Sequence, residues 1–225
     1  MLVSVHLPKT AGSSFHASLE TYFGDGLVLD YADRPINQSP LTRKAASLKA
    51  SFQLAYRYRD TGVVCIHGHF LPLKYRWIST PSGQKYVVWL RDPIERLASH
   101  YYYWVRDYNP KTAGKRRRRM VEEHWTLEQF CFSKEMRNIY TTFFWGFPIS
   151  RFDFVGITEN YASDLSYFAA EILGSELPMS AANVNPQKTT DCYVEDEHLR
   201  SRLEQFHQKD MDLYRDALKV SNGRK

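Results

Sequence analysis

The hydrophobic residues at the start of the chain form short β-branched runs that alternate with a helical pattern. Residues 2–7 are an apolar run that ends at Pro8, and residues 15–23 follow with helical spacing and end near Gly24. A second short apolar run covers residues 27–31. This order of strand, loop, helix and strand predicts a βαβ unit, and therefore a parallel sheet.

The same alternation continues to the end of the chain. Further strands are expected at residues 63–66, 85–90 and 152–157, and further helices at residues 41–59, 94–106, 160–173 and 196–220. A capping-box pattern at residues 126–129 predicts one more short helix. Loops are expected at residues 109–119 and 178–194. Since no repeat or linker is visible, residues 1–225 predict one domain, a three-layer α/β sandwich around a central parallel sheet.

The composition is that of a globular protein and excludes two other classes. Of the 225 residues, 43% are hydrophobic and 24% charged, which argues against a disordered chain. The mean hydropathy is −0.49, and no apolar stretch approaches the length of a membrane span. The three cysteines are far apart and odd in number, which excludes a zinc ribbon or a disulfide scaffold and suits a reducing compartment.

The net charge of +5 comes from one contiguous run, Lys115 to Arg119, without which the charges would balance. A local run of this kind indicates one binding site for an anionic partner and not a generally cationic protein. From the residues alone, the run fits a solvated loop, a nucleic-acid patch or a site for an acidic substrate.

The loop between the first strand and the first helix has the composition of an anion-binding site. Residues 9–14 read Lys-Thr-Ala-Gly-Ser-Ser. Unpaired amides at a helix start bind anions, Gly12 allows close approach, and Lys9 adds a charge. The loop lacks the glycine and lysine spacing of both a Walker A loop and a dinucleotide-binding loop. The alternative is an ordinary βα turn with solvated polar residues.

A second candidate anion site follows the strand at residues 85–90. Arg91 comes directly after this strand, at the edge where open α/β sheets bind ligands. Its planar guanidinium suits a phosphate, and Ser99 lies about two helical turns further on. In the alternative interpretation Arg91 pairs with Asp92 or Glu95.

Two histidines follow the strand at residues 63–66, and they fit three roles. His67 and His69 are two positions apart, so their side chains are expected on one side of an extended chain. They fit a general base, a metal site or structural residues. A metal would need a third ligand, and none lies at suitable spacing, so no metal is expected.

The segments at residues 6–15 and 90–103 together resemble a known family. They are similar to the 5′-phosphosulfate and 3′-phosphate motifs of sulfotransferases that use 3′-phosphoadenosine 5′-phosphosulfate (PAPS), most closely the heparan sulfate and uronyl 2-O-sulfotransferase branch. The His67-Gly-His69 pair, residues 154–159 and residues 188–190 match later segments of that branch in order. The resemblance implies the fold shared by P-loop kinases and these sulfotransferases.

The resemblance also implies roles for individual residues. His69 would be the catalytic base, His67 would orient the substrate, and Lys9 would stabilise the leaving phosphate. The donor-binding residues would be Lys9, Thr10, Ala11, Gly12, Ser13, Ser14, Phe15, Arg91, Ser99, Lys188 and Thr189. The acceptor, a hydroxyl on an anionic saccharide, would be bound by Arg116, Arg117 and Arg118.

The predicted function is therefore in-line sulfuryl transfer from PAPS to a hydroxyl, with no metal and no nucleic acid involved. A small-molecule kinase and a non-enzymatic polyanion-binding protein that uses residues 115–119 are the alternatives. A protein tyrosine or a lipid headgroup also stays open as the acceptor. No signal peptide is visible, so a cytoplasmic protein is expected, or a soluble catalytic domain trimmed of a Golgi anchor.

Overall fold

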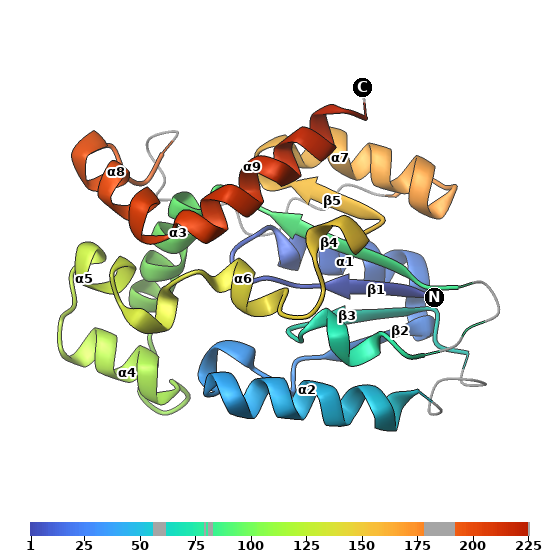
Figure 1. Ribbon diagram of the computed structural model, residues 1–225, viewed down its shortest axis with the longest axis horizontal. Helices are drawn as coiled ribbons and strands as arrows, with labels where there is room; N and C mark the ends of the chain where they lie inside the picture. The colour runs from blue at the N-terminus through green and yellow to red at the C-terminus, as the bar shows by residue number, and fades with distance from the viewer. Residues whose placement is uncertain (56–61, 79, 81–82, 178–191, 225) are drawn as a thin grey trace.

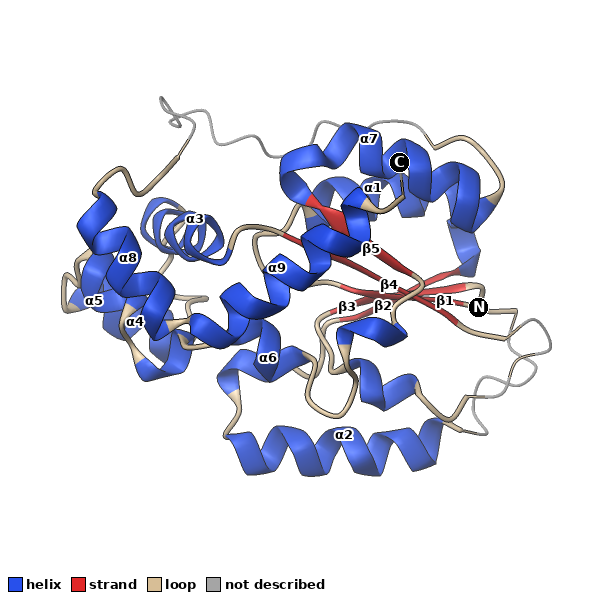
Figure 2. Ribbon diagram, turned by 45° about the horizontal axis from the view of Figure 1, so that its top comes forward, coloured by secondary structure: helices blue, strands red, loops and turns tan. Residues whose placement is uncertain are grey.

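The computed structural model describes residues 1–55, 62–78, 80, 83–177 and 192–224, and a five-stranded parallel sheet lies at its centre (Figures 1 and 2). The strands are β1 (Leu2–Val5), β2 (Leu27–Asp30), β3 (Cys65–Gly68), β4 (Lys85–Leu90) and β5 (Phe154–Ile157). Their order is β2-β3-β1-β4-β5, and every neighbouring pair is parallel. The predicted parallel sheet is thus confirmed, with β1 in the middle.

Helices cover both faces of the sheet, which confirms the three-layer α/β sandwich. Alternate strand residues point to opposite faces, so Leu2 and Val87 pack on one side while Val3 and Val88 pack on the other. The first face is covered by α1 (Gly12–Phe23), α7 (Tyr161–Tyr167) and a π-helical continuation (Phe168–Leu173). The second is covered by α2 (Pro40–Leu54), α6 (Ile139–Phe143) and α9 (Gln208–Asn222) (Figure 1).

A separate group of helices lies beyond the carboxyl ends of the strands, at the left of Figure 1. It consists of α3 (Pro93–Arg106), α4 (Lys115–Glu122), α5 (Leu127–Cys131) and α8 (Glu197–Phe206). Its own apolar core includes Leu97, Met120, Phe130 and Leu203. These helices therefore form a wall beside the sheet edge where ligands bind in open α/β folds.

The basic run is helical, so the prediction of a loop there was wrong. Residues 115–122 form α4, with Gly114 as the N-cap. Lys and Arg have favourable helix propensity, and Met120 fixes the helix by inserting into the core. The charge repulsion is relieved locally, since Arg119 pairs with Glu123 one turn on, at 3.6 Å.

The predicted long helix at residues 196–220 is two helices, α8 and α9, which meet at His207. The His207 ring is buried and makes two tertiary contacts: Nε2 donates to the Cys131 carbonyl at 2.9 Å, and Nδ1 accepts from the Asn138 amide at 3.3 Å. These contacts hold His207 away from helical geometry, at φ −102° and ψ 24°.

The other predicted helices lie at the expected positions with shifted ends, whereas the short helix α6 was not predicted. Thr126 and Gln129 form the expected capping box at the start of α5. Helix α2 ends at Leu54, earlier than predicted, and residues 56–61 lie outside the described part of the chain. Within the described ranges, no helix is both long enough and apolar enough to cross a membrane.

Candidate functional site

The loop after β1 has the backbone geometry of an anion site. Lys9 and Ala11 have positive φ angles of 69° and 60°, and the Thr10 hydroxyl donates to the Leu7 carbonyl at 3.0 Å. Helix α1 begins at Gly12; Ala11 offers no side-chain cap, and the first turn carries no acidic residue. The N-terminus of α1 therefore suits an anion from outside, because the N-cap side chain does not occupy it and the helix dipole favours a negative charge.

Gly12 is required because the imidazole of His6 lies directly against it. A Cβ atom at position 12 would lie 1.8 Å from His6 Nε2. The other His6 ring nitrogen, Nδ1, is hydrogen bonded to the Tyr31 hydroxyl at 2.9 Å. His6 therefore fills the space below the anion loop and links it to the end of β2.

His69 is held in the tautomer that a general base needs. Its Nδ1 lies 2.5 Å from the His6 carbonyl oxygen. A carbonyl only accepts, so Nδ1 carries the proton and the lone pair is on Nε2. Burial lowers the pKa of His69, although the hydrogen bond to His6 opposes this. The imidazole is thus neutral and able to take a proton at neutral pH.

His67 lies deeper, behind the other imidazoles. Its side chain is 1% exposed, and its Nδ1 is hydrogen bonded to the Ser4 hydroxyl at 2.8 Å. The ring is stacked between those of His6 and His16, at centroid distances of 5.1 and 5.6 Å. Burial lowers the pKa of His67 to about 3. Because it is enclosed, His67 supports the neighbouring rings and lies out of reach of an external substrate.

The charged residues around Lys9 come from distant parts of the sequence. Lys9 Nζ lies 4.4 Å from the centre of the Tyr103 ring, and the Arg117 guanidinium lies 5.3 Å from the same ring. Burial, followed by the positive charges of Arg106 and Arg91, lowers the pKa of Lys9. The loop after β1, the end of β4 and helices α3 and α4 thus build one electropositive region.

Arg91 directly follows β4, and Ser99 lies on the helix α3 that begins two residues later. The Tyr140 hydroxyl holds the Arg91 backbone, since it accepts from the amide at 3.2 Å and donates to the carbonyl at 2.6 Å. Arg91 Nη2 is 3.8 Å from Glu95 Oε2. Ser99, one turn beyond Glu95, is 7% exposed. The alternative pairing with Glu95 therefore exists, but at 3.8 Å it is longer than a hydrogen bond.

The three arginines predicted to bind the acceptor differ in their surroundings. All donate to backbone carbonyls: Arg116 to Ile36, Arg117 to Trp104 at 3.0 Å, and Arg118 to Pro110 at 2.7 Å. Arg117 also contacts Tyr103, the residue on which Lys9 lies. Of the three, Arg117 is thus the one that this shared contact links to the anion loop.

Two predicted donor-binding residues, Lys188 and Thr189, lie outside the described residues. Within the described part, no group of three or more His, Cys, Asp or Glu side chains is arranged to hold a metal ion.

Sequence analysis assigned no role to His6, Tyr31, Tyr103 or Tyr140, which the structure places at the site. His6 could have been identified as a site residue from the sequence, because it begins the segment that leads to Gly12. Tyr31, Tyr103 and Tyr140 gave no such signal, because they reach the site only through tertiary packing.

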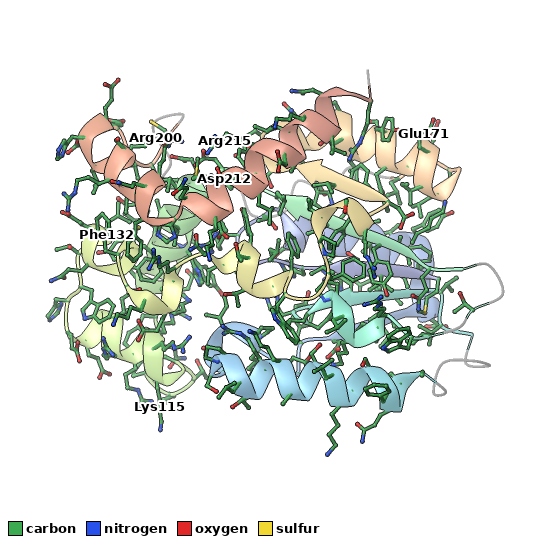
Figure 3. All side chains as sticks on the ribbon, in the orientation of Figure 1. Lys115, Phe132, Glu171, Arg200, Asp212 and Arg215 are labelled. Atoms are coloured by element: carbon green, nitrogen blue, oxygen red, sulfur yellow. The ribbon has the colours of Figure 1, made fainter. Side chains whose placement is uncertain are left out.

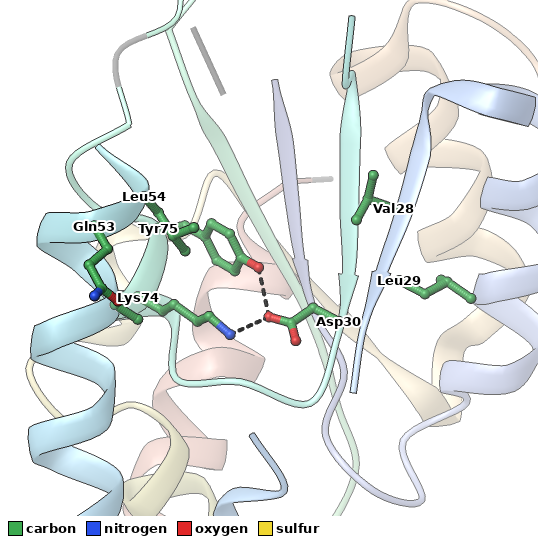
Figure 4. A pocket seen from close by; sticks show the side chains of 8 residues that line it. Val28, Leu29, Asp30, Gln53, Leu54, Lys74 and Tyr75 are labelled. Atoms are coloured by element: carbon green, nitrogen blue, oxygen red, sulfur yellow. Dashed lines mark hydrogen bonds and ion pairs between the residues drawn. The ribbon is translucent and has the colours of Figure 1, made fainter. Parts of the chain in front are cut away.

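A pocket of about 650 Å³ between β2 and α2 contains none of the predicted site residues (Figure 4). Its polar residues satisfy one another: Asp30 Oδ2 accepts from Lys74 at 2.6 Å and from Tyr75 at 2.7 Å. Lys74 also bonds to Asp33 at 2.9 Å. This network anchors Asp30, the last residue of β2, directly before Tyr31.

The chain is similar in structure to a crystal structure of a sulfotransferase from Alicyclobacillus acidocaldarius. The match covers 94% of this chain and 92% of that chain, at 15% sequence identity and a TM-score of 0.48. No family model matches the sequence, and no curated protein matches it.

Proposed function

We propose that this protein is a PAPS-dependent sulfotransferase, with residues 1–225 acting as one domain. One observation carries the proposal: the carboxyl ends of β1, β3 and β4 bring an anion loop, a basic imidazole and a guanidinium to the same edge. Sulfuryl transfer from a nucleotide with two phosphate groups needs these three functions together.

The donor would be bound at two places on this edge. The N-terminus of α1, with Lys9, suits the 5′-phosphosulfate, because Ala11 supplies no side-chain cap and the helix dipole favours an anion; the resemblance extends this site over residues 10–15. Arg91 and Ser99 suit the 3′-phosphate, and the resemblance adds Lys188 and Thr189. The absence of a Walker-type lysine argues against the alternative of a small-molecule kinase.

The reaction would be an in-line displacement at sulfur. The acceptor oxygen forms a bond to sulfur, the bond between sulfur and the 5′-phosphate oxygen breaks, and both electrons of that bond leave with the phosphate. His69 Nε2 takes the proton of the acceptor hydroxyl, since Nδ1 already donates to His6. Lys9 and the loop amides stabilise the charge on the departing phosphate. The products are a sulfate ester and 3′,5′-adenosine bisphosphate.

The acceptor is proposed to be a hydroxyl on an anionic saccharide. The electropositive region beside Lys9 favours an acidic substrate, and Arg117 is best placed to contact it. Arg116 and Arg118 would act mainly by fixing α4 through their carbonyl contacts.

The activity is tested by incubation with PAPS and a panel of hydroxyl acceptors, with release of 3′,5′-adenosine bisphosphate as the readout. The panel contains acidic and neutral saccharides, a tyrosine peptide and a hydroxylated lipid. Acceptor-dependent release that disappears in His69→Ala supports the proposal. A chain that binds the donor but transfers to no acceptor, or an unaffected His69→Ala variant, contradicts it.

A further inference from the structure

Arg200 lies on α8, where Figure 3 labels it, and its ion pairs connect this part of the chain to the segment that follows Arg91. Its Nη2 lies 2.7 Å from Asp92 Oδ2, and its Nη1 lies 3.9 Å from Glu95 Oε1. The remaining nitrogen, Nε, lies 3.1 Å from Glu204. Every nitrogen of this guanidinium thus faces a carboxylate, which makes Arg200 a poor candidate for direct contact with an anion.

The two carboxylates that Arg200 contacts are both held by backbone amides, and they belong to the residue directly after Arg91 and to one whose carboxylate is 3.8 Å from it. Asp92 Oδ1 caps α3 by accepting from the Ile94 and Glu95 amides, both at 3.0 Å. The Glu95 carboxylate accepts from the Tyr193 amide, at 2.9 and 3.1 Å. Neither side chain can turn away without breaking these bonds, so both negative charges stay close to Arg91.

These charges oppose the binding of a phosphate by Arg91. The Asp92 and Glu95 side chains are only 16% and 10% exposed, so water screens them weakly. The Glu95 carboxylate, 3.8 Å from Arg91, would offset the charge of that guanidinium, and the two carboxylates together would repel a dianion. A second positive charge is needed, and Arg200 supplies it, since its guanidinium contacts both carboxylates.

We infer that Arg200 is a positioning residue that neutralises Asp92 and Glu95, and so leaves Arg91 to bind the 3′-phosphate of the nucleotide. Arg200 would thereby set the preference for a nucleotide that carries a 3′-phosphate. This inference rests on the proposed function, because it assumes that the anion at Arg91 is that phosphate.

The test compares two nucleotides that differ only in the 3′-phosphate, 3′,5′-adenosine bisphosphate and 5′-AMP. Calorimetry gives both Kd values for the wild type, Arg200→Gln and a matched control, Arg202→Gln. Arg202 is on the same helix, but it is 49% exposed and pairs with Glu128 at 2.8 Å, away from Arg91. In Arg200→Gln, the Kd for the bisphosphate should rise about tenfold. The Kd for 5′-AMP should stay within about twofold, and the control should change neither.

A double variant separates the charge effect from a structural one. Glu95→Gln in the Arg200→Gln background removes one carboxylate charge and keeps an oxygen for the Tyr193 amide, so it should restore much of the bisphosphate affinity. An unchanged bisphosphate Kd in Arg200→Gln, an equal loss for both nucleotides, or no recovery in the double variant would overturn the inference. Wild-type protein that does not bind the bisphosphate would instead overturn the proposed function.

Discussion

The Nδ1 atom of His69 lies 2.5 Å from the carbonyl oxygen of His6, across the ends of two neighbouring strands. This contact joins the candidate base to the loop that would hold the donor. It also fixes the His69 proton on Nδ1 and leaves Nε2 with its lone pair. The backbone that starts the anion loop therefore sets the chemistry of the imidazole beside it.

Replacement of His69 by Ala should abolish most of the catalysis and leave nucleotide binding intact. General base catalysis contributes about 10²–10⁴-fold to turnover, so kcat should fall by that factor. The Kd for 3′,5′-adenosine bisphosphate should stay within about twofold, since no donor contact is lost. Stopped-time transfer assays and calorimetry on the same preparation measure both quantities. A large loss of nucleotide affinity would assign His69 to donor binding instead.

The buried histidines should make the fold sensitive to acid. Burial lowers the pKa of His67 to about 3 and that of His207 to about 4, while histidines in an unfolded chain titrate near the ordinary value of 6.5. The unfolded state therefore binds more protons between these values. Stability is fully present above about pH 6.5 and is lost as the pH falls towards the folded pKa values. At pH 5 the loss due to His67 alone should be about 2 kcal/mol.

Urea unfolding at pH 7 and pH 5 measures this effect. His67→Asn should lose less stability than the wild type between the two pH values, and the exposed His198→Asn should behave like the wild type. An equal pH dependence in all three proteins would mean that His67 is not held neutral by burial.

Gly12→Ala should damage the anion loop by displacing His6. The added Cβ would lie 1.8 Å from His6 Nε2, so the ring has to move, and overpacking of this kind costs about 1–3 kcal/mol. The affinity for 3′,5′-adenosine bisphosphate should also fall, because the loop proposed to bind it is distorted. Gly114→Ala is the control, because a Cβ there meets no atom within 4 Å. If both variants melt and bind alike, the close packing of His6 against Gly12 has no functional consequence.

Arg117→Ala should weaken the binding of the acceptor more than the binding of the donor. Its guanidinium lies on the Tyr103 ring, which Lys9 also contacts, whereas Arg119 on the same helix is 52% exposed and pairs with Glu123. For an anionic acceptor, KM should rise about tenfold in Arg117→Ala and change little in Arg119→Ala. The effect should shrink at high ionic strength, because salt screens the attraction. Equal effects of the two substitutions would indicate general charge attraction by α4.

The sheet was predictable from sequence because its signals are local. Buried parallel strands are apolar runs, and both ends of the strand at Lys85–Leu90 were predicted correctly. The Gly12 loop was also predictable, and Pro93 indicated the start of α3, whereas the Asp92 cap was found only in the structure.

The features that local pattern misplaced depend on tertiary contacts. The basic run was predicted to be a loop. It is a helix because Met120 packs into an apolar core that cannot be recognised from the sequence. The helix break at His207 follows from ring contacts with Cys131 and Asn138, which are about 70 residues away. The burial of His67 likewise depends on His6 and His16, so pattern alone could not separate its role from that of His69.

The most direct test of the account is calorimetric titration with 3′,5′-adenosine bisphosphate, with ATP and Mg²⁺ as the comparison, on the wild type and Arg91→Ala. The account predicts about micromolar binding of the bisphosphate to the wild type, much weaker binding of ATP, and loss of at least about tenfold in bisphosphate affinity in the variant. Preferential, magnesium-dependent binding of ATP would contradict it in favour of a kinase. If neither nucleotide binds, while polyanions bind through residues 115–119, the result would contradict the account and indicate a polyanion-binding protein.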